Sequence, residues 1–130
     1  MLYQHLFIPQ VDLISFIPLH PTKLRLRGYN QGQEIALELG KILQIPVKNL
    51  LEKTTNTKSQ AQIKNQQERL VRMQGLFQVR TKYLDFIKNK RVLLVDDVLT
   101  TGATLNAASQ ALKETHVKVI IGLIVASKME

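Results

Sequence analysis

Cysteine and tryptophan are absent from this chain of 130 residues, and aromatic residues make up only 5% of it. Without cysteine, the chain has no disulfide, no thiolate metal site and no cysteine nucleophile of its own. No apolar run approaches the ~18 residues that suggest a membrane-spanning helix. The opening residues lack a basic segment followed by an apolar stretch, so we expect no secretory signal peptide. Together these absences favour the reducing cytoplasm.

Acidic residues are also scarce. The chain has 10 Asp and Glu against 18 Lys and Arg, which gives a net charge of +8. Such an excess favours anionic partners, namely phosphorylated metabolites, nucleic acid or acidic membrane surfaces. A basic domain without an anionic partner is the plainer alternative. Apolar residues, at 45%, are frequent enough for a folded core, and the length predicts a single domain over residues 1–130.

Apolar runs alternate along the chain with segments of helical spacing. The runs that indicate strands cover residues 12–19, 47–51, 76–79, 91–95 and 117–126. A helix is expected after Asn30, a capping residue with Gln33 in the capping-box position, and before Pro46. Further helices are expected at 65–74 and 104–114, with a basic loop at 20–30 and a mobile polar loop at 53–62. This order predicts an α/β fold with a mainly parallel sheet, buried on both faces and flanked by helices.

The most informative segment is RVLLVDDVLTTGATL, at 91–105, where an apolar strand ends on two adjacent acids. Ligands of such sheets bind beyond the carboxyl ends of the strands, which is where Asp96 and Asp97 are expected. Their carboxylates can accept hydrogen bonds from sugar hydroxyls or hold Mg²⁺, directly or through water. The Thr- and Gly-rich loop and the start of the next helix can hold a phosphate.

A ligand that carries a ribose diol, a phosphate and a metal ion would satisfy both parts of this segment. A solvated acid pair beside an ordinary helix cap is the plainer alternative. The motif G-x-x-x-x-G-K-[ST] is absent, so a nucleoside triphosphatase of that type is unsupported.

The segment VLLVDDVLTTGAT resembles the ribose-phosphate signature of type I phosphoribosyltransferases, which bind phosphoribosyl pyrophosphate (PRPP) with Mg²⁺. With IPLHPTKLRLRGYNQ, the loop at 56–62 and NQQERLVRMQGLFQV, the similarity narrows to the ComF-type competence family, which acts in DNA uptake by transformable bacteria. The resemblance implies a type I phosphoribosyltransferase-like core and a PRPP or ribose 5-phosphate ligand with Mg²⁺. It also implies single-stranded DNA and other DNA-uptake proteins as partners.

The same resemblance implies roles for individual residues. Asp96 and Asp97 would contact the ribose hydroxyls and Mg²⁺. The 5′-phosphate would be wrapped by Thr100, Thr101, Gly102, Ala103 and Thr104. Pyrophosphate would lie against the loop after the first strand, through Lys23, Arg25 and Arg27. Residues 56–64 correspond to the loop that closes over the substrate in active transferases.

Two departures from the family pattern limit these expectations. Purine-salvage enzymes of the superfamily have an Asp at the position of Thr100, so purine salvage is disfavoured. Full-length ComF-type proteins commonly carry an N-terminal cysteine-rich zinc element, which this cysteine-free sequence lacks. No hood that would recognise an acceptor is evident beside the core. A transferase that releases pyrophosphate from PRPP, and a regulator that senses nucleotides, therefore stay open beside the DNA-binding role.

Positive charge gathers a second time between Lys58 and Lys82. This region has six basic residues against Glu68 alone, with several glutamines between them. Cations mixed with amides suit a phosphate backbone, and the residues assigned to DNA are Lys58, Lys64, Arg69 and Arg72. Stacking candidates are few, namely Tyr29, Phe77 and Tyr83. A solvated helix face is the alternative interpretation of this region.

Overall fold

The computed structural model describes residues 10–19, 21–54, 76–97 and 102–125. Its elements, in chain order, are β1 (Leu13–Phe16), α1 (Pro21–Arg27), α2 (Gln31–Leu43), β2 (Leu51–Lys53), β3 (Phe77–Val79), the 3₁₀-helix η3 (Thr81–Tyr83), β4 (Arg91–Asp97), α4 (Gly102–Lys113) and β5 (Val119–Val125). Of the polar loop predicted at 53–62, Lys53 belongs to β2 and residues 55–62 lie outside the described ranges. The helix predicted at 65–74 lies outside them too.

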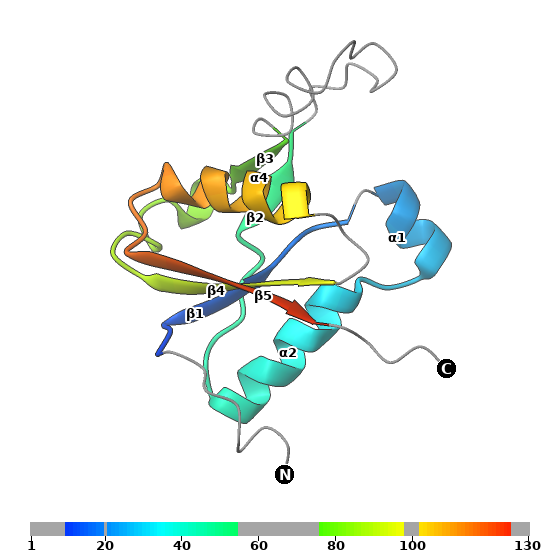
Figure 1. The fold of residues 1–130 in the computed structure, drawn as a ribbon, viewed down its shortest axis with the longest axis horizontal. Helices are drawn as coiled ribbons and strands as arrows, with labels where there is room; N and C mark the ends of the chain where they lie inside the picture. The colour runs from blue at the N-terminus through cyan, green and yellow to red at the C-terminus, as the bar shows by residue number, and fades with distance from the viewer. Residues whose placement is uncertain (1–9, 20, 55–75, 98–101, 126–130) are drawn as a thin grey trace.

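A parallel sheet of order β1–β4–β5 forms the centre of the molecule. In the central strand, Val92 pairs with Leu13 of β1 and with Ile120 of β5. Helix α2 covers one face of this sheet, while α4 and the antiparallel pair β2–β3 cover the other (Figure 1). The predicted α/β class, with a mainly parallel sheet flanked by helices, is therefore confirmed.

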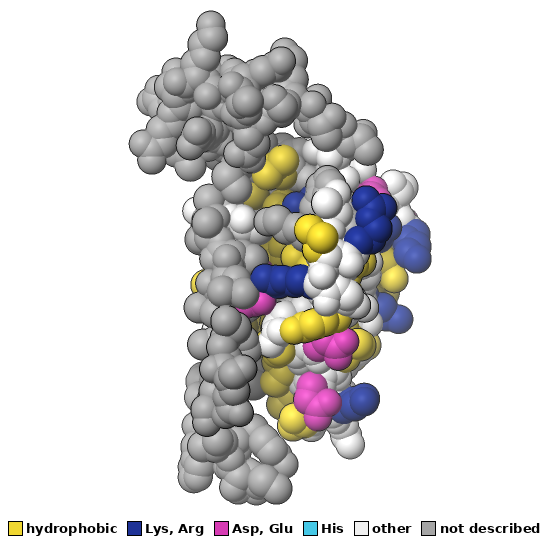
Figure 2. Space-filling model, turned by 90° about the vertical axis from the view of Figure 1, so that its right-hand side faces the viewer, with side chains coloured by type: hydrophobic (Ala, Val, Ile, Leu, Met, Phe, Trp, Pro, Cys, Tyr) yellow, Lys and Arg dark blue, Asp and Glu magenta, His cyan; other side chains and the backbone are white. Residues whose placement is uncertain are grey.

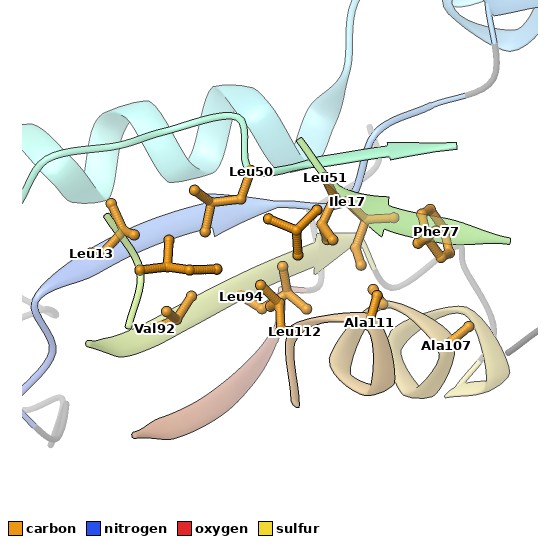
Figure 3. Close-up of a cluster of buried hydrophobic side chains, with 13 residues drawn as sticks. Leu13, Ile17, Leu50, Leu51, Phe77, Val92, Leu94, Ala107, Ala111 and Leu112 are labelled. Atoms are coloured by element: carbon orange, nitrogen blue, oxygen red, sulfur yellow. The ribbon is translucent and has the colours of Figure 1, made fainter. Parts of the chain in front are cut away.

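Two apolar clusters hold these layers together. The cluster on the α4 side, shown in Figure 3, contains Leu94 of β4 and Leu112 of α4. The cluster on the α2 side contains Leu93 of β4 and Ala36 of α2. Leu93 and Leu94 belong to opposite clusters because successive side chains of a strand point to opposite faces. Each fully buried leucine contributes roughly 1.5–3 kcal/mol, so β4 is fixed from both sides.

The prediction of a loop at 20–30 is wrong over most of this range, because Pro21–Arg27 form helix α1. Proline is favoured at the first helical position, where its missing N–H is not needed, and the Lys, Leu and Arg residues that follow are good helix formers. The helix ends at Gly28, which has φ +81° and donates its N–H to the Leu24 carbonyl at 2.7 Å. The basic residues of this segment are therefore presented on a helix.

Two predicted strands also need correction. The strand expected at 47–51 begins as β2 only at Leu51, and Val47 makes a single parallel bridge to Ile14. The last strand was expected to be buried on both faces, yet Val119 and Ile124 are 42% and 49% exposed. Its exposure follows from its position, because β5 is an edge strand of the described sheet, whereas the other edge strand, β1, is flanked by the segment that bonds to Ile14 through Pro46 and Lys48.

The two long helices begin close to where the sequence predicts. The side-chain oxygen of Asn30 accepts a 3.2 Å hydrogen bond from the backbone N–H of Gln33 and so caps α2. Helix α2 ends at Leu43, before Pro46, as expected. Helix α4 covers Gly102–Lys113, where a helix is predicted at 104–114. Both helices therefore start at the end of the sheet where β1 and β4 finish (Figure 1).

Candidate functional site

The acid pair, Asp96 and Asp97, occupies the last two positions of β4 and pairs with Ile124 and Val125 of β5. Only 2% of Asp96 and 5% of Asp97 is exposed. The backbone N–H of Asp97 donates a 2.8 Å hydrogen bond to a carboxylate oxygen of Asp96. Burying two adjacent carboxylates is costly unless positive charge or hydrogen-bond donors compensate them, so the surroundings of this pair decide what it can bind.

Part of the compensation comes from Arg27, the last residue of α1. Its Nη1 atom lies 3.5 Å from Oδ2 of Asp97, although the two residues are 70 positions apart in sequence. They meet because β1 and β4 are parallel neighbours, and the chain leaves both strands at the same end of the sheet. The Asp97 side chain is 7% exposed and that of Arg27 is 38% exposed. The guanidinium is therefore accessible to an incoming anion.

Figure 2 looks onto this end of the molecule. Among the described side chains of this view, Lys and Arg lie mostly towards the right-hand side, and one basic side chain near the centre lies beside an acidic one. The described part of this face is therefore mixed in charge.

The N-terminus of α2 lies against the same end of β4. Asn30 is buried, and its amide donates a 3.0 Å hydrogen bond to the carbonyl of Ile17, just after β1. A Cβ added to Gly32 would lie 3.5 Å from the Val95 carbonyl oxygen and 3.9 Å from Cα of Asp96. The start of α2 therefore approaches the backbone of the acid pair closely, with the positive end of its dipole.

Sequence reasoning found Asn30 as a helix cap but missed its second hydrogen bond and the position of Gly32. The available signal was the Asn-Gln-Gly sequence at 30–32, directly after the basic segment. A small residue in the first turn of a capped helix permits close packing against a neighbouring strand. The two residues fix the start of α2 against the carboxyl ends of β1 and β4.

The predicted phosphate-binding residues are described in part. Gly102 and Ala103 form the start of α4, five residues beyond Asp97, and Thr104 is partly buried in the first turn. Thr100 and Thr101 lie outside the described residues. A helix N-terminus just after the acid pair is a geometry that suits phosphate. The side-chain assignments in this loop stay predictions.

The other predicted residues are divided between α1 and the undescribed part of the chain. Lys23, Arg25 and Arg27 all belong to α1, and Arg25 is exposed in its last turn. The residues assigned to DNA, which are Lys58, Lys64, Arg69 and Arg72, lie outside the described ranges. Within those ranges, no three His, Cys, Asp or Glu side chains come together as a metal cluster.

No helix in the described part of the chain is long and apolar enough to cross a bilayer.

The sequence profile of the family described as phosphoribosyl transferase domain matches residues 27–130. Competence protein F of Haemophilus influenzae is 32% identical over 110 residues, which cover 84% of this chain and 47% of that protein. Competence protein ComFC of Streptococcus pneumoniae is 35% identical over 107 residues, which cover 78% of this chain and 42% of that protein. The chain thus spans less than half the length of these two relatives.

A shorter similarity and two solved structures point to the same fold. An adenine phosphoribosyltransferase of Treponema denticola is 44% identical over 46 residues, or 35% of this chain and 24% of that protein. The glutamine PRPP amidotransferase of B. subtilis, complexed with ADP and GMP, superposes with a TM-score of 0.61 at 20% identity, over 95% of this chain and 24% of that one. A structure of the allosteric regulatory enzyme of purine biosynthesis gives a TM-score of 0.60 at 18% identity, over 95% of this chain and 23% of that one. The predicted type I phosphoribosyltransferase-like core and the resemblance to competence proteins are both confirmed.

Proposed function

This chain belongs to the phosphoribosyl transferase domain family, and from that premise we propose that it binds PRPP or a related ribose 5-phosphate together with Mg²⁺. The observation that carries the proposal is the buried acid pair at the carboxyl end of β4, followed within a few residues by the start of α4. Acceptors for hydroxyl groups and donors for a phosphate therefore lie at one end of the sheet. Ligands of open α/β sheets bind at this end.

Each part of the ligand would meet a different group. The carboxylates of Asp96 and Asp97 accept hydrogen bonds from the ribose hydroxyls, each contributing roughly 1.5–3 kcal/mol. The N–H groups in the first turn of α4 hold the 5′-phosphate, assisted by the hydroxyls of Thr100, Thr101 and Thr104. Mg²⁺, when bound, supplies positive charge to the acid pair and to the pyrophosphate.

Arg27 would also take part in binding the ligand. Its guanidinium faces Asp97 at 3.5 Å. Pyrophosphate carries more negative charge than one carboxylate, and the planar guanidinium can donate two parallel hydrogen bonds to it. In the proposed bound state Arg27 would turn from Asp97 to the pyrophosphate, and Asp96 and Asp97 would hold Mg²⁺. Lys23 and Arg25 add positive charge from the same helix.

The cellular part of the proposal comes from the relatives. Both curated proteins that match most of this chain are named competence proteins. We propose that the chain acts in the cytoplasm in DNA uptake during natural transformation, with single-stranded DNA and other uptake proteins as partners. The net charge of +8 supports a polyanionic partner. The basic residues between 58 and 72, together with those of α1, are the first candidates for the contact.

An active transferase is the second candidate, and the family match favours it. Displacement of pyrophosphate from PRPP needs positive charge on the leaving group while charge develops at the ribose. Arg27 stands on α1 beside the acid pair and would supply it, with Arg25 as a second cation on the same helix. Thr100 stands where purine-salvage enzymes carry Asp, so a purine acceptor of that kind is disfavoured. A regulator that senses nucleotides would use the same residues without turnover.

Isothermal titration with PRPP, in the presence and absence of Mg²⁺, tests the binding proposal. The wild type should bind only with Mg²⁺, and the Asp96→Asn, Asp97→Asn double variant should bind at least several-fold more weakly. Asp85→Asn is the matched control, because the Asp85 side chain is 99% exposed and its loss should leave the affinity unchanged. Equal affinity of the double variant and the wild type would refute the assignment. Pyrophosphate release with candidate acceptors distinguishes a transferase from a binding protein.

A further inference from the structure

The amino end of the sheet carries a second group of basic and aromatic side chains, opposite the acid pair. It is built from the segments that precede β4 and β5, at the left-hand end of the sheet in Figure 1. Two backbone hydrogen bonds join these segments. The N–H of Asn89 donates to the His116 carbonyl at 2.9 Å, and the N–H of Lys118 donates to the Lys90 carbonyl at 2.9 Å. Lysines that are distant in sequence are therefore neighbours on this surface.

Four side chains form a continuous row here. The Nζ atom of Lys82 lies 5.1 Å from the ring centroid of Tyr83, and that of Lys90 lies 5.4 Å from the ring centroid of Phe86. The two rings are 6.2 Å apart. Phe86 is 43% exposed, whereas its neighbour Ile87 is fully buried. The segment is thus anchored in the core by one side chain while an adjacent aromatic ring faces solvent.

The charge around this row is strongly positive. Residues 81–90 and 113–118 contain five lysines against only Asp85 and Glu114. Asp85 pairs with Lys88 at 3.3 Å, but the two side chains are 99% and 54% exposed. Such an exposed pair contributes little, so a phosphate can replace the carboxylate readily. We call this surface the amino-end patch, and its members are Lys82, Tyr83, Phe86, Lys88, Lys90 and Lys118.

We propose that the amino-end patch binds single-stranded nucleic acid, as a surface separate from the PRPP site. Unpaired bases stack on exposed aromatic rings, and the lysines whose ammonium groups lie over these rings can turn outwards to neutralise phosphates. A duplex keeps its base faces stacked inside, so the rings favour single strands. Strand β4 has seven residues from Arg91 to Asp97, so roughly 20 Å separates the patch from the acid pair.

This inference rests on the proposed role in DNA uptake, and it names the surface that would contact the single-stranded nucleic acid. A strand bound at the amino end would leave the PRPP site open, so both ligands would bind one molecule together. In this arrangement PRPP does not compete with the nucleic acid. That property separates the amino-end patch from a DNA site on α1.

Fluorescence anisotropy of labelled oligo-dT and oligo-U with the full chain tests the stacking part. Phe86→Ala should weaken binding about fivefold or more, the effect of losing one stacked base. Phe86→Tyr keeps the aromatic face and should keep the affinity. Urea unfolding of each variant checks that the fold is retained. Tighter binding of dT than of U makes DNA the ligand, and the reverse makes it RNA.

Salt dependence tests the charge part. Lys82→Gln with Lys90→Gln should weaken binding and flatten the slope of log K against log salt by about 1.4, if each lysine contacts one phosphate. Lys41→Gln with Lys48→Gln removes the same charge from the end of α2 and the loop after it, and should leave the slope as in the wild type.

The outcomes separate this inference from the proposed function. Unchanged nucleic-acid binding in Phe86→Ala and in the Lys82, Lys90 double variant overturns the patch. An equal loss of affinity in this double variant and in the Lys41, Lys48 control also overturns it. Displacement of the oligonucleotide by PRPP with Mg²⁺ overturns it too. If Arg25→Gln alone abolishes binding, the DNA role stands and the patch fails. If the wild type binds the strand but not PRPP, and the Phe86 and lysine variants weaken the strand as expected, the patch stands and the proposed ribose-phosphate function fails.

Discussion

Replacing Arg27 with Gln should have opposite effects on two ligands of one site. The guanidinium lies 3.5 Å from Asp97 and acts there as a counter-ion. Glutamine keeps much of the length and polarity without the charge. In the proposed site Mg²⁺ alone would compete with Arg27 for the acid pair, so it should bind the variant more tightly. PRPP at saturating Mg²⁺ would use Arg27 for its pyrophosphate, so it should bind the variant more weakly.

The geometry sets the size of both effects. Two unit charges at 3.5 Å attract by about 5 kcal/mol at an effective dielectric constant of ~20 and by about 1 kcal/mol in bulk water. Because the Arg27 side chain is 38% exposed, we take about 1 kcal/mol, which corresponds to roughly fivefold tighter binding of Mg²⁺. Loss of a charged hydrogen bond to pyrophosphate, worth ~1.5–3 kcal/mol, lowers PRPP affinity by about ten- to 150-fold.

Isothermal titration measures the two affinities separately, first with Mg²⁺ alone and then with PRPP at saturating Mg²⁺. Arg80→Gln is the matched control. Nη1 of Arg80 lies 3.3 Å from a carboxylate oxygen of Glu52, and its side chain is 35% exposed, so this variant removes a similar ion pair from the β2–β3 sheet. The control should leave both affinities unchanged. If Arg27→Gln weakened both ligands, or changed neither, Arg27 would not exchange between the acid pair and the pyrophosphate.

Gly40→Ala should lower the free energy of unfolding in urea by about 1–3 kcal/mol, because an added Cβ would lie 2.5 Å from Cγ2 of Val47. An unchanged urea midpoint would show that the neighbouring residues move aside without cost. Hydrogen bonds from the side chain and the backbone N–H of Arg91 hold the pKa of Asp12 well below its usual 3.8. The wild type should therefore be more stable than Asp12→Asn above about pH 5, and this difference in stability should shrink as the pH falls below 4 towards the lowered pKa. Urea midpoints of the two proteins that differ by a constant amount across this pH range would contradict the linkage. Gly102→Val should keep the urea midpoint but abolish PRPP binding in the calorimeter, because the phosphate must approach the start of α4 closely; retained affinity would remove the reason for a phosphate site there.

Local signals were sufficient to predict the parts of the site that depend on neighbouring residues. Asp96 and Asp97 follow an unbroken apolar run, so their position at the end of a buried strand could be predicted without a fold. Asn30 is followed by Gln33 and by a helical pattern, which located the start of α2. In both places the residues that decide the structure lie within one or two turns of each other.

The parts that could not be predicted depend on strand order. The pairing of Arg27 with Asp97 joins residues 70 positions apart and follows from the contact between β1 and β4. The exposure of β5 could not be predicted either, because the sequence of an apolar strand does not show whether the strand lies at the centre or at the edge of a sheet. Helix α1 was missed for another reason. Its seven residues are fewer than the ~10–12 that helical periodicity needs for detection.

The exposure of α1 determines how costly the proposed exchange of Arg27 would be. Leu24 and Leu26 are 41% and 83% exposed, so this helix gains little of the ~25 cal/mol per Å² that burial gives to the helices on the sheet faces. An element with few buried apolar contacts opens at low free energy. The ion pair with Asp97 is then one of the contacts that hold α1 at the site. A ligand that draws Arg27 away from Asp97 would remove this contact, so the position of α1 should depend on whether the pyrophosphate part of the site is filled.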